Sequence, residues 1–262
     1  MQNAVRVLLL LVLCGVAVAA HAQTPTRIVS LAPTLTAMVG ELGAAGSLVA
    51  VTPFCDAPEN IRRVPGGMQP EAEALLALQP DLVLATSITP AATLRQLRAL
   101  GIRTEVIQAS SLSQISHAMD HLAGILKVPP RRVAISAAVP AQRSAALLFG
   151  AETGYSAGCG THAHEILISA GLRNVAADAA GPWPQLGEEF LLAADPDVII
   201  VADYGAAKRD DVLALMRGHP VRKHLAAVRA GRVVVFPAAA FSIPGPAALD
   251  AGEKLRAEVE KL

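Results

Sequence analysis

The chain has few aromatic residues, few cysteines and no excess of either charge. Lys and Arg together number 22, as do Asp and Glu, so no basic field favours nucleic acid. No glycine-rich phosphate loop with a following lysine occurs, which argues against ATP binding by this chain. Of the 262 residues, 53% are hydrophobic and only 3% are aromatic. The composition therefore supports a large buried core, and each aromatic ring stands out.

A long apolar run occurs only at the start of the chain. Arg6 precedes an apolar run over residues 7–20, and the AHA sequence at 20–22 fits a small-x-small cleavage pattern. The run of about 14 residues is short of the ~20 that span a bilayer. We therefore predict a cleaved secretory signal over residues 1–22 and a periplasmic mature chain, with an uncleaved anchor as the alternative.

After residue 22, short β-rich runs alternate with helical patterns. Strands are expected at 27–31, 48–51, 81–85, 104–107, 145–149, 197–202 and 232–236. Helices are expected at 35–42, 70–78, 90–100, 111–126, 131–141, 161–170, 188–194, 211–217, 221–228 and 246–261. This alternation predicts an α/β protein with mostly parallel sheets. We expect an N-terminal lobe at 23–112, a linking helical segment at 113–142 and a C-terminal lobe at 143–262.

One stretch of the sequence is repeated. EALLALQPDLVL at 73–84 returns as EFLLAADPDVII at 189–200, in each case a helix, a Pro-Asp pair and a strand. The repeat indicates two lobes of related structure. No Gly/Ser linker separates them, so we expect restricted relative motion and a ligand at the carboxyl ends of the strands.

Several motifs in this order resemble a known family. They include RIVSLAPTLTAMVGELG from residue 27, VPGGMQPEAEALLALQPDLVLA from 64 and GPWPQLGEEFLLAADPD from 181. They are similar to the periplasmic binding proteins of ABC importers for vitamin B12, haem and iron–siderophores, above all to the vitamin B12 branch. The resemblance implies two Rossmann-like lobes joined by a helix, with a ligand cleft between them. The segment before Pro140 looks shorter than the linking helix usual in that family.

The same resemblance implies a function and partners. We expect a monomeric, non-enzymatic protein that captures cobalamin or another corrinoid, with haem or a ferric siderophore as the alternative. It would deliver this metal chelate to an inner-membrane ABC permease dimer with its ATPase. By motif position, Glu73 and Glu189 would dock onto the permease.

The loops that follow strands supply the candidate ligand-binding residues. A flat macrocycle would use aromatic rings there, although core packing is the ordinary role of any one ring. The candidates are Thr34, Phe54, Cys55, Asp56, Gly67, Ser87, Tyr155, Cys159, His162, Trp183, Tyr204 and Phe241.

The run Cys159–Gly160–Thr161–His162–Ala163–His164 combines soft and imidazole ligands. His162 and His164 lie two apart at a helix start and diverge by roughly 200°, so a closed bare-metal site is not expected. An axial contact from Cys159 or His162 to a chelated metal remains open, as does an ordinary loop. An oxidising compartment also permits a disulfide between Cys55 and Cys159.

An enzymatic alternative comes from the sequence GYSAG at 154–158, which matches the G-x-S-x-G nucleophile elbow of secreted serine hydrolases. Asp203 and His219 follow Ser156 in a suitable order. However, Ser156 is predicted to lie in the middle of a loop, whereas the elbow requires a tight strand-to-helix turn.

Overall fold

The computed structural model describes residues 24–67, 70–131, 133, 135, 140–205 and 207–262. The predicted signal at 1–22 lies outside the described residues, and so does most of the helix expected at 131–141. Those residues of 131–141 that are described belong to no helix. Within the described part of the chain, every helix is too short or too polar to cross a membrane.

The first half of the chain forms a parallel five-stranded sheet. Its strand order is β3 (Arg62–Arg63), β2 (Leu48–Val51), β1 (Ile28–Ser30), β4 (Leu82–Ala85) and β5 (Thr104–Val106). Its helices are α2 (Pro33–Glu41), η2 (Ala45–Ser47), α3 (Ala72–Leu76), α4 (Ala91–Ala99) and α5 (Leu112–Leu126). Strands β1 and β4 are fully buried, as expected for a parallel sheet covered by helices on both faces.

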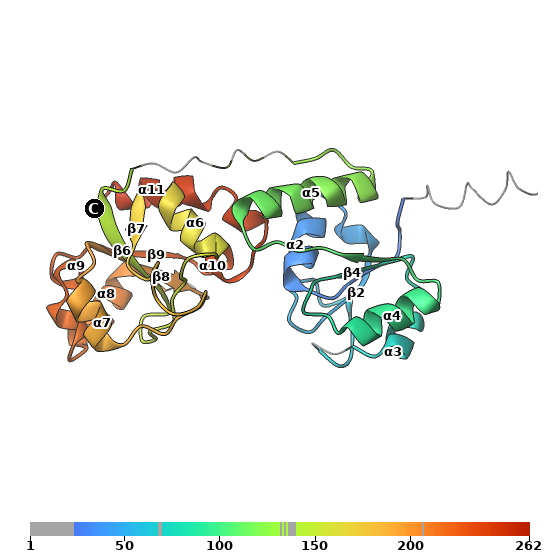
Figure 1. Ribbon diagram of the computed structural model, residues 1–262, viewed down its shortest axis with the longest axis horizontal. Coiled ribbons are helices and arrows are strands. Elements are labelled where there is room, and N and C mark those ends of the chain that lie inside the picture. The colour runs from blue at the N-terminus through green and yellow to red at the C-terminus, as the bar shows by residue number, and fades with distance from the viewer. Residues whose placement is uncertain (1–23, 68–69, 132, 134, 136–139, 206) are drawn as a thin grey trace, which may run out of the picture.

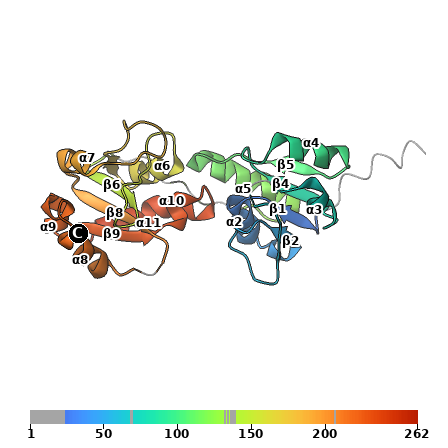
Figure 2. The ribbon, with the colours of Figure 1, turned by 90° about the horizontal axis from the view of Figure 1, so that it is seen from below.

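The second half forms a parallel four-stranded sheet. Its order is β7 (Leu172–Asn174), β6 (Arg143–Phe149), β8 (Val198–Asp203) and β9 (Val233–Pro237). Its helices are α6 (His162–Ser169), α7 (Glu188–Ala194), α8 (Arg209–Gly218), η3 (Arg222–His224), α9 (Ala226–Arg229), α10 (Ala239–Ser242), η4 (Pro246–Ala248) and α11 (Ala251–Val259). Two lobes result, lying side by side (Figures 1 and 2). The predicted α/β class with two Rossmann-like lobes is confirmed.

The repeated sequence has the same structural role in both lobes. Asp81 accepts hydrogen bonds from the backbone N–H groups of Thr26 and Arg27 at the start of β1, at 2.8 and 3.1 Å. Asp197 accepts one from the N–H of Ser144 near the start of β6, at 2.8 Å. Each carboxylate therefore joins the beginnings of two adjacent central strands. The pairs α3–β4 and α7–β8 are structurally equivalent.

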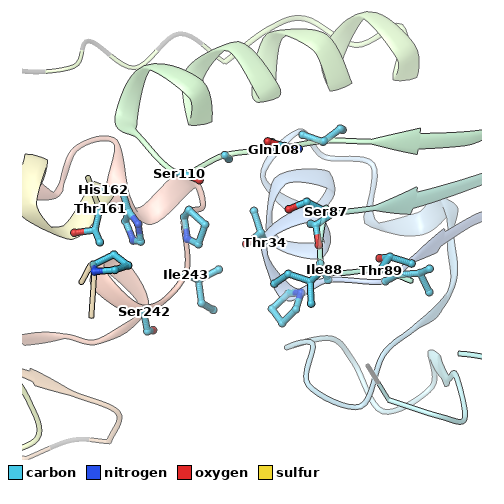
Figure 3. A pocket seen from close by; sticks show the side chains of 18 of the residues that line it. Thr34, Ser87, Ile88, Thr89, Gln108, Ser110, Thr161, His162, Ser242 and Ile243 are labelled. Carbon is cyan, nitrogen blue, oxygen red and sulfur yellow. The ribbon is translucent and has the colours of Figure 1, made fainter. Parts of the chain in front are cut away.

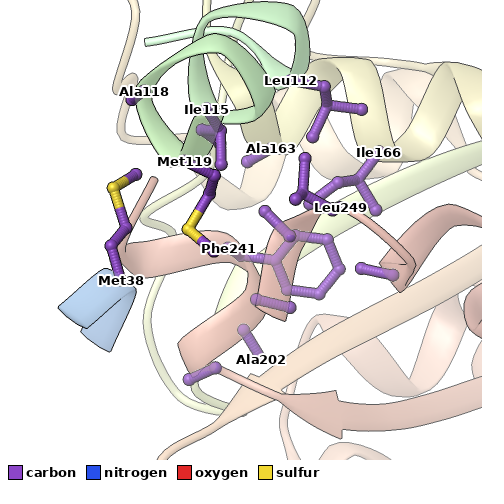
Figure 4. Close-up of a cluster of buried hydrophobic side chains, with 14 of the residues drawn as sticks. Met38, Leu112, Ile115, Ala118, Met119, Ala163, Ile166, Ala202, Phe241 and Leu249 are labelled. Carbon is purple, nitrogen blue, oxygen red and sulfur yellow. The ribbon is translucent and has the colours of Figure 1, made fainter. Parts of the chain in front are cut away.

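The two lobes share one hydrophobic core rather than a flexible junction. Helix α5 begins at Ser111, whose hydroxyl accepts a hydrogen bond from the N–H of Gln114. It packs against α2 of the first lobe and against α6 and η4 of the second. Met38, Met119 and Phe241 are fully or almost fully buried in the resulting cluster, which extends across both lobes (Figure 4). This shared core supports the expected restriction of relative lobe motion.

The structure differs from the sequence expectations at several elements. Strands β3 and β7 and helix α10 were not predicted. The helix expected at 221–228 is divided into η3 and α9, and the one at 246–261 into η4 and α11. Ends marked by glycine were placed well: α4 is followed by Gly101 and α6 by Gly171, both with a φ of 78° that glycine adopts without strain. The lobe boundaries at 112 and 142 stay predictions.

Candidate functional site: a cleft between the lobes

A cavity of about 540 Å³ lies between the lobes, on the side of the strands' carboxyl ends. The first lobe contributes residues 31–34 after β1, Pro70, residues 86–89 after β4 and residues 107–110 after β5. The second lobe contributes residues 160–162, 182–183 and 242–244. Figure 3 shows Thr34, Ser87 and Ile88 on one side of this cavity and His162 and Ile243 on the other. The site lies where the α/β topology predicts a ligand.

A second cavity of about 400 Å³ continues the cleft along the second lobe. It is lined by Phe149, Tyr155, Ser156, Trp183, Tyr204 and Ser242. Trp183 and Ser242 line both cavities, so the two are contiguous. The residues Tyr155, Trp183 and Tyr204 are 55%, 47% and 72% exposed, respectively. Exposed aromatic surface in a cleft is suited to a large, partly apolar ligand.

Backbone pairing between two loops holds Tyr155 and Trp183, here called the aromatic wall, in place. Gly154 O accepts a hydrogen bond from Leu186 N at 2.8 Å, and Ser156 N donates to Pro184 O at 2.9 Å. A Cβ at Gly154 would overlap the carbonyl oxygen of Leu186, and one at Gly158 would lie 2.8 Å from Gly181 O. Two glycines of the GYSAG sequence therefore permit close backbone approach.

The serine hydrolase alternative lacks its geometry. Ser156 is 1% exposed, and its hydroxyl has no hydrogen-bond partner among the described residues. The carboxylate of Asp203 accepts hydrogen bonds from the N–H groups of Gly205 and Ala207. His219 Nδ1 accepts from the N–H groups of Val221 and Arg222. Each proposed triad member thus lies in a different local structure, and no base among the described residues is hydrogen-bonded to Ser156.

His162 is the most strongly perturbed titratable group of the cleft. It is the first residue of α6, whose N-cap hydroxyl at Thr161 accepts a hydrogen bond from the N–H of His164. Burial lowers the pKa of His162 to about 4, against hydrogen bonds with the backbone of Phe241 and Ala240 that raise it. The ring is therefore neutral at pH 7. Its Nε2 is buried without a hydrogen-bond partner in the described part of the chain.

The described lining of the cleft is uncharged at neutral pH. None of the described residues that line the two cavities is Asp, Glu, Lys or Arg. Polar groups come from hydroxyls, the amide of Gln108 and neutral His162. Because an unpaired charge is costly to bury, such a wall favours a ligand whose buried part is uncharged.

The structure brings together half of the residues proposed from sequence. Thr34, Ser87, His162 and Trp183 line the first cavity, and Tyr155 and Tyr204 line the second. Ligand contact by these residues stays a prediction. The cleft also contains Ile88, Gln108, Ser110, Ser242 and Ile243, which sequence reasoning did not select. Ile88, Gln108 and Ser110 follow the predicted strands β4 and β5, which was the available signal. Ser242 and Ile243 lie at the end of the unpredicted helix α10, so the sequence had no signal for them.

Cys55 and Phe241 lie in the hydrophobic core, not in the cleft, so the expectation for their side chains was wrong. Cys55 is 4% exposed, and its Sγ lies 3.1 Å from Thr52 Oγ1. Phe241 is fully buried, and its ring packs 5.6 Å from that of Phe236. Cys55 and Cys159 are both free cysteines, so the disulfide considered from sequence is not formed.

The remaining candidates line neither cavity. Phe54 and Asp56 are exposed on the loop after β2, where the Phe54 ring packs beside Gly67. Cys159 is exposed next to Gly160. Of the two proposed axial residues, only His162 is part of the cleft wall.

The proposed docking residues lie outside the cleft. Glu73 on α3 and Glu189 on α7 are both exposed. Figure 1 shows α3 and α7 on the same side of the molecule, opposite α5 and α11.

Comparison with known proteins identifies relatives of this architecture. A family model described as "periplasmic binding protein" matches residues 28–240. The vitamin B12-binding protein of Yersinia pestis is 30% identical over 200 residues, which cover 69% of this chain and 71% of that protein. A periplasmic haem-binding protein from Pseudomonas aeruginosa is 26% identical, with a TM-score of 0.69 over 90% of this chain and 92% of the other. An ABC-type Fe³⁺-hydroxamate transport protein from Saccharomonospora viridis is also 26% identical, with a TM-score of 0.61 over 91% and 94%.

Proposed function

This chain belongs to the periplasmic binding protein family, and we propose that it captures a corrinoid, cobalamin first, and delivers it to an ABC importer. The family binds small metal chelates for such importers, and its members work in the periplasm. The cleft between the lobes is the binding site. Glu73 and Glu189 meet the permease dimer, whose ATPase supplies the energy.

The uncharged lining of the cleft is the observation that supports this choice of ligand. Cobalamin has a periphery of neutral amides, which hydroxyl and amide side chains can bind. Haem carries two propionates, and burying these anions requires cationic partners, of which none is found among the described residues that line the cavities. The relative with the highest sequence identity quoted above is a vitamin B12-binding protein, which agrees with this choice.

A ferric hydroxamate is the second candidate, because its chelating groups neutralise the metal's charge and one relative belongs to a Fe³⁺-hydroxamate transport system. Haem is the third. A hydrolase that uses Ser156 is not favoured, because no base is hydrogen-bonded to its hydroxyl in the described structure.

Titration of the purified mature chain distinguishes these candidates. Cyanocobalamin, ferrioxamine and hemin are each added while visible absorption and heat are recorded. We expect saturable 1:1 binding of cyanocobalamin. Saturable binding of hemin alone would show that the corrinoid assignment and the charge argument are both wrong.

Substitutions inside and outside the cleft test whether the chelate binds there. Trp183→Ala removes a ring that lines both cavities and should weaken binding about 30-fold, the equivalent of ~2 kcal/mol for an aromatic hot spot. Phe190→Ala is the matched control, since Phe190 is 39% exposed on α7 and lines neither cavity. Equal affinities of the two variants would place the ligand elsewhere.

A further inference from the structure

The repeated element presents the same pair of exposed side chains on each lobe. In α3, Leu76 follows Glu73 by three residues, and in α7, Leu192 follows Glu189 by three. Residues three apart lie on one face of a helix, so each glutamate is adjacent to a leucine. Leu76 is 41% exposed and Leu192 is 42% exposed. The two surfaces, Glu73–Leu76 and Glu189–Leu192, are called here the N-lobe and C-lobe surfaces.

The exposed leucines are not the residues that anchor their helices in the core. In each helix the preceding leucine serves that purpose: Leu75 is fully buried and Leu191 is 1% exposed. A single exposed leucine on a protein surface requires no explanation. Here, however, an exposed leucine recurs at the same position of a structural repeat, with the same exposure and the same spacing from an exposed carboxylate. Both helices also lie on the same side of the molecule (Figure 1).

We propose that Leu76 and Leu192 form part of the docking contact, so that each lobe binds an apolar site next to a basic side chain on the membrane permease. The inference rests on the proposed function, which names the permease as partner, and adds the apolar half of the contact. Charges at the rim of an interface chiefly set the orientation and rate of encounter. A buried apolar anchor beside them excludes water and slows dissociation.

Charge and geometry favour a two-fold membrane partner over a second copy of this chain. Two equivalent surfaces on one side of the molecule match two equivalent sites of a dimer. If two copies of this chain met through the same surfaces, carboxylates would face carboxylates, and like charges at an interface are repulsive.

Site-specific crosslinking tests the contact without depending on the ligand. A photoreactive benzoylphenylalanine replaces Leu76 or Leu192 in the full chain, which is expressed in its own host. The controls carry it at Leu100 or Leu215, one per lobe, which are 51% and 46% exposed outside the repeat. We expect both test positions, and neither control, to crosslink to the transmembrane subunit of an ABC importer. Crosslinking at neither test position, or equally at all four, would overturn the inference.

Alanine variants then measure the contribution of the leucines. In a host that lacks its own copy of the gene, Leu76→Ala with Leu192→Ala should lower the initial uptake of limiting radiolabelled cyanocobalamin at least tenfold. Binding of cyanocobalamin to the purified variant should be unchanged. Leu100→Ala with Leu215→Ala should leave uptake at the wild-type level.

The outcomes separate this inference from the proposed function. Normal uptake by the Leu76/Leu192 variant, together with impaired uptake by Glu73→Ala with Glu189→Ala, would refute the apolar contact and leave the glutamate docking intact. Crosslinking to the permease without cobalamin binding would refute the corrinoid assignment and leave the docking surfaces intact.

Discussion

Arg222 joins the loop before the aromatic wall to the helix that carries Glu189, and its removal should loosen both. Its side chain is only 2% exposed. Nη2 donates to Glu188 Oε1 at 2.7 Å and to the carbonyl of Thr153 at 3.1 Å, and Nε donates to Glu188 Oε1 at 3.0 Å. Nη1 donates to the carbonyl of Ala151. One guanidinium therefore fixes residues 151–153 to the first turn of α7.

The loss of stability expected for Arg222→Met depends on the partners of Arg222 that are left without a donor. Breaking a buried ion pair costs about 3–5 kcal/mol when the remaining charge stays buried. Glu188 is 34% exposed, so its carboxylate can return partly to water. The carbonyl of half-buried Ala151 would lose its donor, and an unsatisfied buried group costs about 1–3 kcal/mol. We therefore expect a loss of about 2–3 kcal/mol in the free energy of unfolding.

Unfolding in guanidinium chloride, followed by circular dichroism, measures this loss. The denaturant concentration at the midpoint should be lower, and the dependence of the unfolding free energy on denaturant concentration should be unchanged. Arg229→Met is the matched control, because Arg229 is exposed and donates only to the carbonyl of His224 among the hydrogen bonds described; it should change stability by less than about 0.5 kcal/mol. Glu188→Gln keeps an acceptor for Arg222 and should cost less than Arg222→Met. If Arg222→Met and Arg229→Met unfold at the same midpoint, the assigned role of Arg222 is wrong.

Two further sets of variants test the residues that stabilise the walls of the cleft. Because the pKa of His162 falls from 6.5 to about 4 on folding, its stability contribution is complete above pH 6.5 and is lost as the pH falls towards 4. Because of this residue, the free energy of unfolding should fall by about 2 kcal/mol between pH 7 and 4.5. In His162→Gln the free energy of unfolding should fall by about 2 kcal/mol less over the same pH range. The same pH dependence in the variant and the wild type would contradict the assignment. Hydrogen bonds from Ser144 lower the pKa of Asp197 below 3.8. The stability contributed by Asp197 is therefore lost only at lower pH, outside the range from pH 7 to 4.5 that tests His162. Gly154→Ala should destabilise by about 1–3 kcal/mol, because its Cβ would overlap the carbonyl of Leu186; Gly124→Ala, in an open position within α5, should stabilise by about 0.5–1 kcal/mol, and reversed signs in thermal unfolding would refute the steric argument.

Most of the strands that could be predicted from the sequence are runs of apolar residues. All seven predicted strands overlap an observed strand. Six of them are mostly buried apolar runs, as expected for strands of parallel sheets, whereas β5 (TEV) is only partly buried. The two missed strands, Arg62–Arg63 and Leu172–Asn174, are short edge strands rich in polar residues. Pairing with a neighbour makes them strands, and a single sequence does not contain that information.

The location of the cleft followed from topology, whereas the side chains that face it did not. Loops after parallel strands reach one edge of a sheet, so Thr34, Ser87 and Trp183 were proposed from sequence, and all three line the cavity. Cys55 and Phe241 also belong to such segments, but packing turns their side chains inward. The unpredicted helix α10 packs against α6, and its Phe241 is fully buried in the core that the two lobes share.

The shared core determines how a ligand can be accommodated. Phe241 at the junction is fully buried, and the cluster around it contains residues from α2, α5 and α11. A large hinge rotation would expose this apolar surface at about 25 cal/mol per Å², so the lobes are held close to one arrangement. Adjustment to a ligand then falls to the loops that line the cavity, of which the segment at 154–158 is itself pinned by pairing with 182–186. The aromatic wall is thus preorganised. The loop at 86–89, where Ser87 and Ile88 are exposed, and the segment at 242–244 are the parts of the cleft left to adapt.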